Sequence, residues 1–163
     1  MECEVIAAQL AAEPNHVRLP LLFRIYAWEG DPTPLVPALC NCLADPDRSV
    51  QQTAVLVLTR CGPEAVPPLT ALLAPLYPAD RRAEAAAALG RMGAEAAPAC
   101  AALCECLRDA DDTLRQQAIF ALGAIGAPAV PHLEELLGDP VVAVSVAALE
   151  AMGRIGPAAG AAR

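Results

Sequence analysis

The sequence predicts an all-α protein, an α-solenoid of about five stacked helix hairpins with about ten helices in a single domain. A short phrase that ends in glycine recurs along the chain, at Arg60-Cys61-Gly62, Arg91-Met92-Gly93, Ala124-Ile125-Gly126 and Arg154-Ile155-Gly156. The glycines lie 31, 33 and 30 residues apart, a period typical of repeats that bury an apolar face only by stacking on their neighbours. Of the 163 residues, 56% are hydrophobic and only 3% are aromatic, which suits small side chains between closely packed helices.

The positions of the recurring glycines define the boundaries of the repeats. We expect units at residues 1–30, 31–62, 63–93, 94–126 and 127–156, with residues 157–163 as the truncated start of a further unit or a tail. The first helices are expected near residues 2–12, 33–44, 64–75, 95–108 and 128–137. The second helices are expected near residues 16–28, 47–61, 80–92, 111–125 and 140–155. Each unit is therefore one helix hairpin.

Local signals mark the ends of the second helices. Aspartates and prolines precede three of them, where unpaired backbone N–H groups and the helix dipole favour such residues. These signals are Asp45-Pro46-Asp47, Asp109 to Asp112 and Asp139-Pro140. Glycine closes four of the helices, since it accepts a left-handed backbone conformation. The first helices share another signal, because Pro67, Pro98 and Pro131 recur in their first turns.

An apolar stripe at positions i, i+4 and i+8 of the second helices predicts the buried seam between units. Its first row is Val17, Val50, Arg81, Leu114 and Val144. Its second row is Leu21, Ala54, Ala85, Ala118 and Ala148. Its third row is Ile25, Leu58, Leu89, Leu122 and Met152.

Two phrases, Ala88-Leu89-Gly90-Arg91-Met92-Gly93 and Ala121-Leu122-Gly123-Ala124-Ile125-Gly126, carry a resemblance to a known family. Preceded by Leu114-Arg115 and Asp109, they resemble HEAT repeats of the short, roughly thirty-residue type first described in phycocyanobilin lyases. The resemblance covers nearly the whole chain. It implies that the second helices line a concave face.

The family pattern also implies an aspartate before the second helix and an arginine just after its first apolar residue. Asp45, Asp109 and Asp139 match the aspartate, and Arg18, Arg82 and Arg115 match the arginine, whereas Gln51 and Ser145 depart from it. A ladder of Asp/Arg pairs between units is therefore expected to be interrupted. We expect these residues to hold units together rather than to bind a ligand, with modest energies at the solvent edge.

The charged residues and their distribution argue against several classes of protein. The net charge is −8, and the eleven basic residues are all arginine. An acidic surface disfavours nucleic acid, and a chain without lysine has neither a phosphate-loop lysine nor a Schiff base. The segment Met1-Glu2-Cys3-Glu4 does not resemble a secretory signal. The uncharged stretch from Gln116 to Leu133 contains glycines and prolines, so we interpret it as two soluble helices and not as a membrane span.

The seven cysteines predict reduced thiols in a cytoplasmic protein, because their number is odd and their spacing differs between units. Cys100 and Cys104 align with core leucines, so we expect core residues and not metal ligands. Cys40 and Cys106, together with Cys3, are the more exposed candidates for a reactive thiol. The two histidines, His16 and His132, lie in distant units, and no zinc or nucleophile motif occurs. We therefore expect no catalytic residue, no metal and no cofactor.

The candidate binding site lies on the second helices, outside the seam. Phe23, Leu56, Ala87, Phe120 and Glu150 share one repeat position, where apolar residues indicate a contact surface. The proposed contact residues are Phe23, Leu56, Phe120, Arg60, Arg91, Arg154, Gln52 and Gln116. Each row has an alternative explanation that stays open. Phe23 and Phe120 could be buried between neighbouring units instead of contacting a partner. Arg60, Arg91 and Arg154 could interact favourably with the dipole at the C-terminal end of their own helix. If both rows face a groove, an acidic segment with apolar anchors would fit.

The two ends of the chain differ in composition. Phe23, Tyr26 and Trp28 cluster in the first unit, where they form either a bulky cap or an aromatic contact site for a partner. The last helix, 140–155, is apolar nearly all round, and such a helix is normally covered. We expect this helix to meet another chain, a symmetry-related copy or a removed continuation of the array, rather than water.

These observations favour a non-enzymatic scaffold or adaptor that binds a protein segment along the concave face. Two alternatives come from the resemblance. The first is a bilin lyase-like helper that attaches or removes a bilin on a phycobiliprotein, which is also the main enzymatic alternative. The second is nucleic-acid binding of the alkylpurine-glycosylase kind, which the acidity of the chain disfavours.

Overall fold

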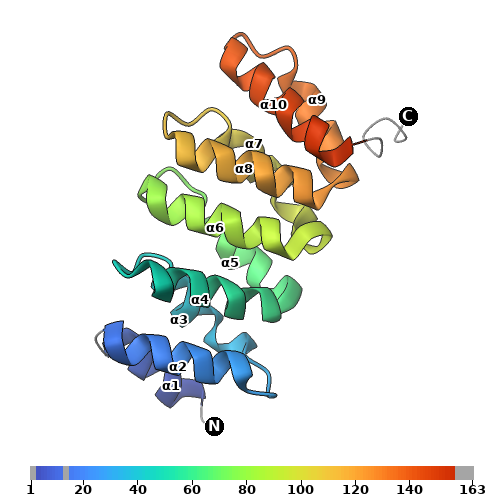
Figure 1. Cartoon of the computed structure of the whole chain (residues 1–163). Coiled ribbons are helices and arrows are strands. Elements are labelled where there is room, and N and C mark those ends of the chain that lie inside the picture. The colour runs from blue at the N-terminus through green and yellow to red at the C-terminus, as the bar shows by residue number, and fades with distance from the viewer. Residues whose placement is uncertain (1–2, 13–14, 157–163) are drawn as a thin grey trace.

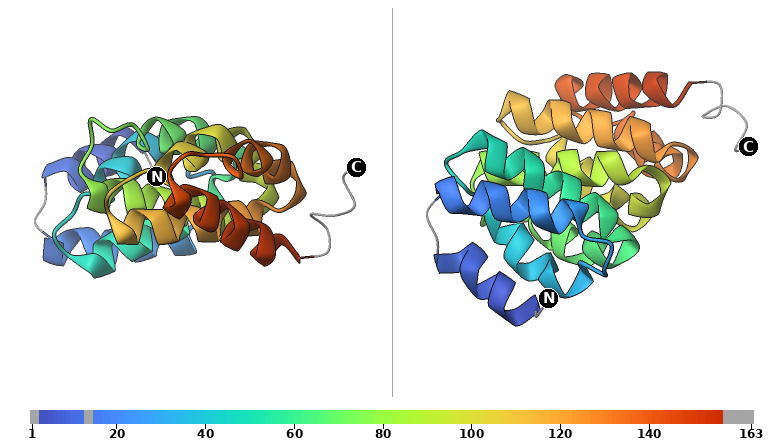
Figure 2. Two further views of the ribbon diagram at one scale, coloured as in Figure 1. Left: turned by 90° about the horizontal axis from the view of Figure 1, so that it is seen from above. Right: turned by 60° about the horizontal axis from the view of Figure 1, so that its bottom comes forward.

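The computed structural model describes residues 3–12 and 15–156, which form ten α-helices and four 3-10 helices and contain no strand. Figure 1 shows a stack of helix hairpins in which one row of helices lies in front of the other. Figure 2 shows the same two layers from above and from below. The predicted α-solenoid is therefore confirmed.

The two rows alternate along the chain. The back row in Figure 1 consists of α1 (Cys3–Ala12), α3 (Val36–Cys42), α5 (Val66–Ala71), α7 (Cys100–Cys106) and α9 (Val130–Leu136). The front row consists of α2 (Asn15–Ala27), α4 (Arg48–Arg60), α6 (Ala79–Met92), α8 (Asp112–Ile125) and α10 (Val142–Ile155). Each back helix contacts the front helix that follows it, and each front helix packs on the next one. We number the hairpins 1 to 5 from α1–α2 to α9–α10.

Four back helices are shorter than predicted because each begins with a 3-10 segment. These segments are η1 (Thr33–Leu35), η2 (Gly62–Ala65), η3 (Gly93–Ala99) and η4 (Ala127–Ala129). Prolines near the helix start remove backbone donors, which favours the tighter turn. Pro67 and Pro131 lie at the second residue of their α-helices as expected, but Pro98 lies inside η3. The expectation for Pro98 was wrong because this connection is longer than the others.

Glycine caps the C-terminal ends of α6, α8 and α10, as predicted, but with a different backbone geometry. At α4 the C-cap is Cys61, and Gly62 follows it. Gly62, Gly93, Gly126 and Gly156 all have positive φ. Gly126 has φ 83° and ψ −141°, so it adopts the mirror image of an extended residue and not a left-handed helical turn. Only glycine reaches this region readily. At Gly62, Gly93 and Gly126 the chain turns sharply from a front helix into the next back helix.

The predicted seam is the core of the stack. Its middle and last rows are buried in every hairpin except at Met152, which is half-buried. Two residues of the first row depart from the prediction. Val17 is exposed because hairpin 1 has no preceding neighbour. Arg81 is half-buried and stacks on the Tyr77 ring at 5.0 Å, and its guanidinium donates to the Cys40 carbonyl of α3.

Aspartates prepare the start of the front helices in two ways. Asp47 and Asp111 are N-caps, and each accepts a hydrogen bond from a backbone N–H in the first turn at 2.8 Å. Asp139 does not cap α10, which begins after Val141 without a side-chain cap. Instead, Asp139 accepts the Val141 N–H at 2.9 Å and shapes the loop before the helix. Asp45 and Asp109 make the same loop contact two residues upstream of their caps.

The Asp/Arg ladder is interrupted at Gln51, as expected, and also at Arg115, which matches the family pattern and was expected to continue it. Arg18 reaches Asp45 of hairpin 2 at 2.6 Å, and Arg82 reaches Asp109 of hairpin 4 at 2.6 Å. Gln51 instead turns back to the carbonyl of its own loop. Arg115 also turns back, and Arg108 contacts Asp139 in its place at 2.8 Å. Arginines thus link successive hairpins, although they come from different repeat positions.

The seven cysteines are all described and all unpaired. Cys40 and Cys106 are buried, so the expectation that they are exposed was wrong; their side chains face the interior between hairpins. Burial raises the pKa of the Cys40 thiol to about 11 and that of Cys104 to about 12, because a thiolate is poorly solvated there. Across residues 3–12 and 15–156 no helix is both long and apolar enough to cross a bilayer.

Candidate functional site

Two adjoining hollows lie on the face formed by the front helices. The first is lined by Arg48, Gln52, Val55, Glu84, Ala87, Arg91 and Gln117. The second, with a volume of about 630 Å³, is lined by Ala87, Arg91, Gln116, Gln117, Phe120 and Arg154. Because Ala87, Arg91 and Gln117 border both, the hollows form one depression from α4 to α10. We call it the second-helix groove.

Arg91 lies at the centre of this groove, where the two hollows meet. It stands in the last turn of α6, and its side chain is exposed. Among the residues that the structure describes, Arg91 has neither a hydrogen-bond partner nor an ion-pair partner. A guanidinium offers five donors in a planar fork that fits a carboxylate. The groove therefore presents an uncommitted cationic donor at its midpoint.

Phe120 supplies the apolar part of the groove. Its side chain is 46% exposed, so the alternative of burial between units was wrong for this residue. The ring lies over Gly90 of α6: a Cβ at Gly90 would be 3.0 Å from Phe120 Cδ1 and 3.0 Å from Ala121 Cα. Glycine at position 90 thus lets α6 and α8 approach closely and gives the ring its place on the surface.

Arg154 borders the far end of the groove. A Cβ at Gly123 would be 2.7 Å from Arg154 Cβ, so the stem of the arginine crosses α8 where that helix has no side chain. Its guanidinium contacts Glu150 at 3.5 Å across one helical turn, and such exposed pairs are weak. Arg154 is therefore held by its stem while its charge stays accessible.

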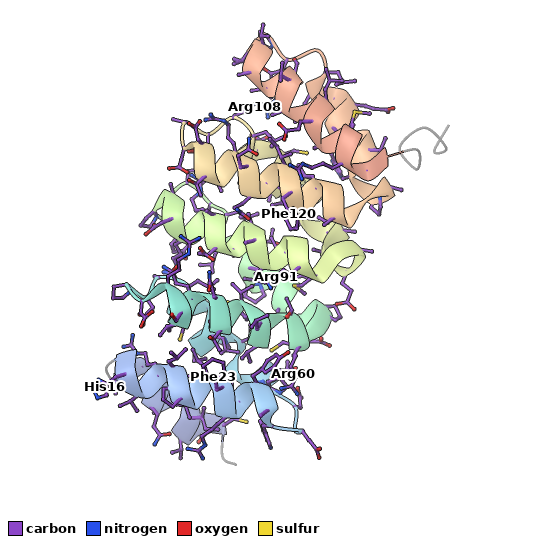
Figure 3. All side chains as sticks on the ribbon, in the orientation of Figure 1. His16, Phe23, Arg60, Arg91, Arg108 and Phe120 are labelled. Carbon is purple, nitrogen blue, oxygen red and sulfur yellow. The ribbon has the colours of Figure 1, made fainter. Side chains whose placement is uncertain are left out.

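Figure 3 shows Phe23, Arg60, Arg91 and Phe120 along the row of front helices. The structure brings five of the predicted contact residues together in the groove lining: Gln52, Arg91, Gln116, Phe120 and Arg154. Phe23 is 54% exposed and lies outside that lining, and so does the half-buried Leu56. As with Phe120, burial between units was the wrong alternative for Phe23.

Arg60 occupies the same repeat position as Arg91 but has a different role. Its guanidinium donates to the carbonyls of Ile25 at 3.0 Å and Trp28 at 2.8 Å, and also to that of Tyr26. It also lies over the Tyr26 ring at 5.8 Å. Arg60 therefore satisfies the carbonyls at the end of α2 and holds hairpin 1 to hairpin 2. The alternative that these arginines interact with the C-terminal end of a helix therefore holds for Arg60. The helix concerned is α2 of the preceding hairpin, and not Arg60's own helix α4.

Sequence reasoning missed several residues that line the groove: Arg48, Val55, Glu84 and Gln117. The repeat alignment contained a signal for two of them. Glu84 and Gln117 share one position, one residue before the second seam row, where both are polar and half-buried. Arg48 is the first residue of α4 and carries no such signal.

The groove is cationic within an acidic protein. Three arginines line it, at positions 48, 91 and 154, against one acidic residue, Glu84. The whole chain has a net charge of −8. In the described part of the chain, no group of three or more His, Cys, Asp or Glu side chains is arranged to hold a metal ion. The groove is therefore distinguished by its positive charge and its exposed aromatic ring.

Comparison with known proteins identifies the family. A sequence profile described as HEAT repeats matches residues 36–112 and 100–162, which together cover well over half of the chain. The chain belongs to the HEAT-repeat family. This assignment confirms the resemblance carried by the repeated Gly90 and Gly123 phrases. A search of curated proteins finds no match.

Solved structures share the fold of this HEAT-repeat protein at low sequence identity. The archaeal HEAT-like repeats protein from Thermococcus onnurineus NA1 is 15% identical with a TM-score of 0.56, over 95% of this chain and 66% of that one. The complex of CpcE and CpcF of phycocyanin lyase from Nostoc sp. PCC7120 is 24% identical with a TM-score of 0.54, over 99% and 68%. A designed armadillo repeat protein in complex with the peptide (KR)4 is 18% identical with a TM-score of 0.51, over 92% and 80%. These likenesses concern the fold.

Proposed function

We propose that this HEAT-repeat protein is a non-enzymatic scaffold that binds a segment of another protein along the second-helix groove. The observation that carries the proposal is Arg91, an exposed guanidinium at the junction of both hollows with no partner among the described residues. The repeat-solenoid fold is typical of protein-binding scaffolds. Extended segments and helices commonly bind in such elongated grooves.

The chemistry of the lining favours an acidic segment with apolar anchors. Arginines pair with carboxylates through two parallel hydrogen bonds. Arg91 of α6 and Arg154 of α10 line the second hollow together with Phe120 of α8, the front helix between them. Exposed aromatic rings and arginines are enriched among residues that dominate binding energy. The designed armadillo protein is in complex with the basic peptide (KR)4, whereas the arginines here favour a ligand of the opposite charge.

The net charge of the whole chain does not prevent such binding. At physiological ionic strength the Debye length is about 8 Å, so charges on distant faces act weakly on a ligand in the groove. The nearby arginines then determine the preference. We expect affinity for an acidic segment to fall as salt rises, because the contacts at Arg91 and Arg154 are solvent-exposed.

Selection from a random library of 12-residue peptides tests this function. Wild-type protein is expected to enrich peptides that combine aspartate or glutamate with one or two large apolar residues. Arg91→Glu reverses the charge at the centre of the groove and is expected to shift the selection toward basic peptides. For a selected acidic peptide, Arg91→Ala should weaken binding about tenfold, which corresponds to about 1.4 kcal/mol.

Arg24→Glu is the matched control, because Arg24 is exposed on α2 outside the groove. This variant should select the same peptides as wild type. Circular dichroism melting checks that every variant is folded. Two results would contradict the proposal. One is that wild type selects peptides without regard to their acidic residues, and the other is that Arg24→Glu changes the selected peptides as much as Arg91→Glu does. Handling of a bilin stays a prediction of the sequence, and absorbance after mixing with a bilin tests it separately.

A further inference from the structure

The outer face of hairpin 5 has the residues of an interface between hairpins, but nothing in the described chain covers it. Leu149 of α10 occupies the repeat position of Leu22, Val55, Ala86 and Ile119. All four of those residues are buried, for example Ile119 at 2% exposure, whereas Leu149 is 57% exposed. The following hairpin covers this position in hairpins 1 to 4.

Two further positions repeat the pattern. Leu43 and Leu107 directly follow α3 and α7 and are buried, whereas Leu137 directly follows α9 and is exposed. Gly90 and Gly123 are covered by side chains of the next hairpin, while a Cβ at the equivalent Gly153 would meet nothing within 4 Å. No residue in the described ranges 3–12 and 15–156 therefore fills this stacking surface on the outer face of hairpin 5.

The opposite end of the stack is different, because it carries a charge at a packing position. Arg24 stands where the other front helices have Val57, Ala88, Ala121 and Ala151, all fully buried against the preceding hairpin. Arg24 is exposed. Ala121 of this position packs on Gly90 of the preceding hairpin, so a second copy that stacked head to tail would bring Arg24 against Gly153 and bury an unpaired guanidinium, which is costly. Head-to-tail stacking of copies is therefore disfavoured.

We propose that a second copy of this chain covers the outer face of hairpin 5, with the two α10 helices packed antiparallel about a two-fold axis. The stripe on α10 consists of Val142, Val146, Leu149 and Gly153, at helical spacing and without charge. Antiparallel pairing sets Leu149 opposite Val146 and Val142 opposite Gly153 of the second copy. A large residue then meets a small one at the ends, whereas parallel pairing would set Gly153 against Gly153 and leave a gap.

This pairing also positions the two grooves. A two-fold axis that lies in the interface and crosses α10 reverses the helix direction but keeps each row of front helices on the same side. Arg154 lies on α10 beside the stripe, so the two second-helix grooves would continue into one another across the interface. The dimer would present one groove of double length, independently of which segment binds there.

The interface is small, so the dimer should depend on concentration. α10 has 14 residues and is therefore about 21 Å long, and two helices about 10 Å apart make an end face of about 20 by 20 Å. This end face is about half of the roughly 800 Å² per partner that a standard interface buries. We expect dissociation in the micromolar range.

Sedimentation velocity of the full chain across a range of micromolar concentrations tests the proposal. The mass should rise from 16.8 kDa to twice that value and no further. Leu149→Glu should hold the protein at the monomer mass. Val5→Glu, at an equally exposed valine on α1, should leave the dimer unchanged. If Leu149→Glu unfolds, Val142→Glu serves instead, because Val142 is 75% exposed.

Disulfide trapping determines the orientation. Val146→Cys combined with Leu149→Cys should form covalent dimers under mild oxidation, and Val146→Cys alone should form few. A monomer at every concentration would overturn the proposal. So would a dimer that survives Leu149→Glu and Val142→Glu, or an open series of oligomers that Val5→Glu abolishes. Efficient trapping by Val146→Cys alone would overturn the antiparallel arrangement.

Discussion

Single residues at the helix ends control the path of the chain. Gly126 has φ 83° and ψ −141°, and a Cβ added there would meet nothing within 4 Å. Its requirement for glycine is therefore conformational and not steric. Gly153 also has open space around it but lies inside α10 without a positive φ. Because neither position would cause a clash, a comparison of substitutions at Gly126 and Gly153 isolates the effect of backbone conformation on stability.

Gly126→Ala should lower the free energy of unfolding by about 1–3 kcal/mol, because a side chain disfavours this backbone region. Gly153→Ala should instead raise it by about 0.5–1 kcal/mol, since alanine is the better helix former. Urea unfolding at a concentration where the protein is monomeric measures both. Equal effects of the two substitutions would contradict this account.

Asp109 makes stability depend on acid pH. The Asp111 N–H and the Arg82 guanidinium hold the pKa of the Asp109 carboxyl below its usual value of about 3.9. The Val141 N–H and Arg108 likewise lower the pKa of Asp139. A carboxylate with a lowered pKa in the folded state stabilises the protein above its unfolded pKa. That contribution is lost as the pH falls through the lower, folded-state pKa.

Thermal melting of wild type should therefore show a falling midpoint as the pH drops below about 4. Asp109→Asn should be less stable than wild type at pH 7 and should lose less on acidification. Asp112→Asn removes a carboxylate whose side chain is 86% exposed and serves as the control. Parallel curves for wild type and Asp109→Asn would show that the lowered pKa does not act on stability.

Pairs of helices are joined by arginines that reach from one hairpin to the next. Arg82 of α6 is 7% exposed and donates to the Leu73 carbonyl at 2.9 Å as well as to Asp109. Arg115, at the same repeat position of α8, contacts Asp112 and the Asp109 carbonyl within its own hairpin. Only the first of these arginines joins two hairpins.

Arg82→Ala should lower the free energy of unfolding by about 2 kcal/mol, because a buried carbonyl and a half-buried carboxylate lose a charged donor. Arg115→Ala should cost less than about 1 kcal/mol, since its carboxylate partner is exposed. Chemical denaturation of both variants measures the difference. A similar loss in the two variants would mean that the contact between hairpins adds nothing beyond the local one.

The whole molecule is a linear stack, so each hairpin is stabilised mainly by its immediate neighbours. Hairpin 1 is an end hairpin, and Arg60 of α4 ties the end of α2 to hairpin 2 through three carbonyls. Loss of this contact should affect the N-terminal end of the stack first. The hairpins near α8 and α10 lie beyond the reach of this arginine.

Arg60→Ala should therefore increase amide hydrogen exchange in α1 and α2 while leaving exchange in α8 close to that of wild type. Mass spectrometry of exchanged peptides resolves the two regions. Arg91→Ala removes an arginine from the same repeat position without breaking a contact between described residues, and it should leave exchange in α1 and α2 unchanged. A uniform rise across all helices would indicate that the stack unfolds as one unit.

The sequence by itself determined the helices, the closing glycines and most of the seam, because these follow from local conformation and from periodicity. The fold class and the HEAT-repeat resemblance needed no tertiary information. Local pattern also indicated five residues of the groove lining: Gln52, Arg91, Gln116, Phe120 and Arg154. Local pattern predicted the exposure of Cys40 and Cys106 wrongly, because both are buried and their burial depends on how the back helices face one another.

Only the tertiary structure decided what each arginine of the repeated phrase does. Arg60, Arg91 and Arg154 share one position in the repeat. Arg60 meets the open carbonyls at the end of α2, Arg91 meets the groove, and Arg154 crosses the bare backbone at Gly123. The carbonyls that Arg60 meets and the glycine that the Arg154 stem crosses both lie on the preceding hairpin, more than thirty residues away, whereas Arg91 has no partner among the described residues. A periodic sequence specifies equivalent positions, but the neighbouring hairpin supplies the contacts that make them different.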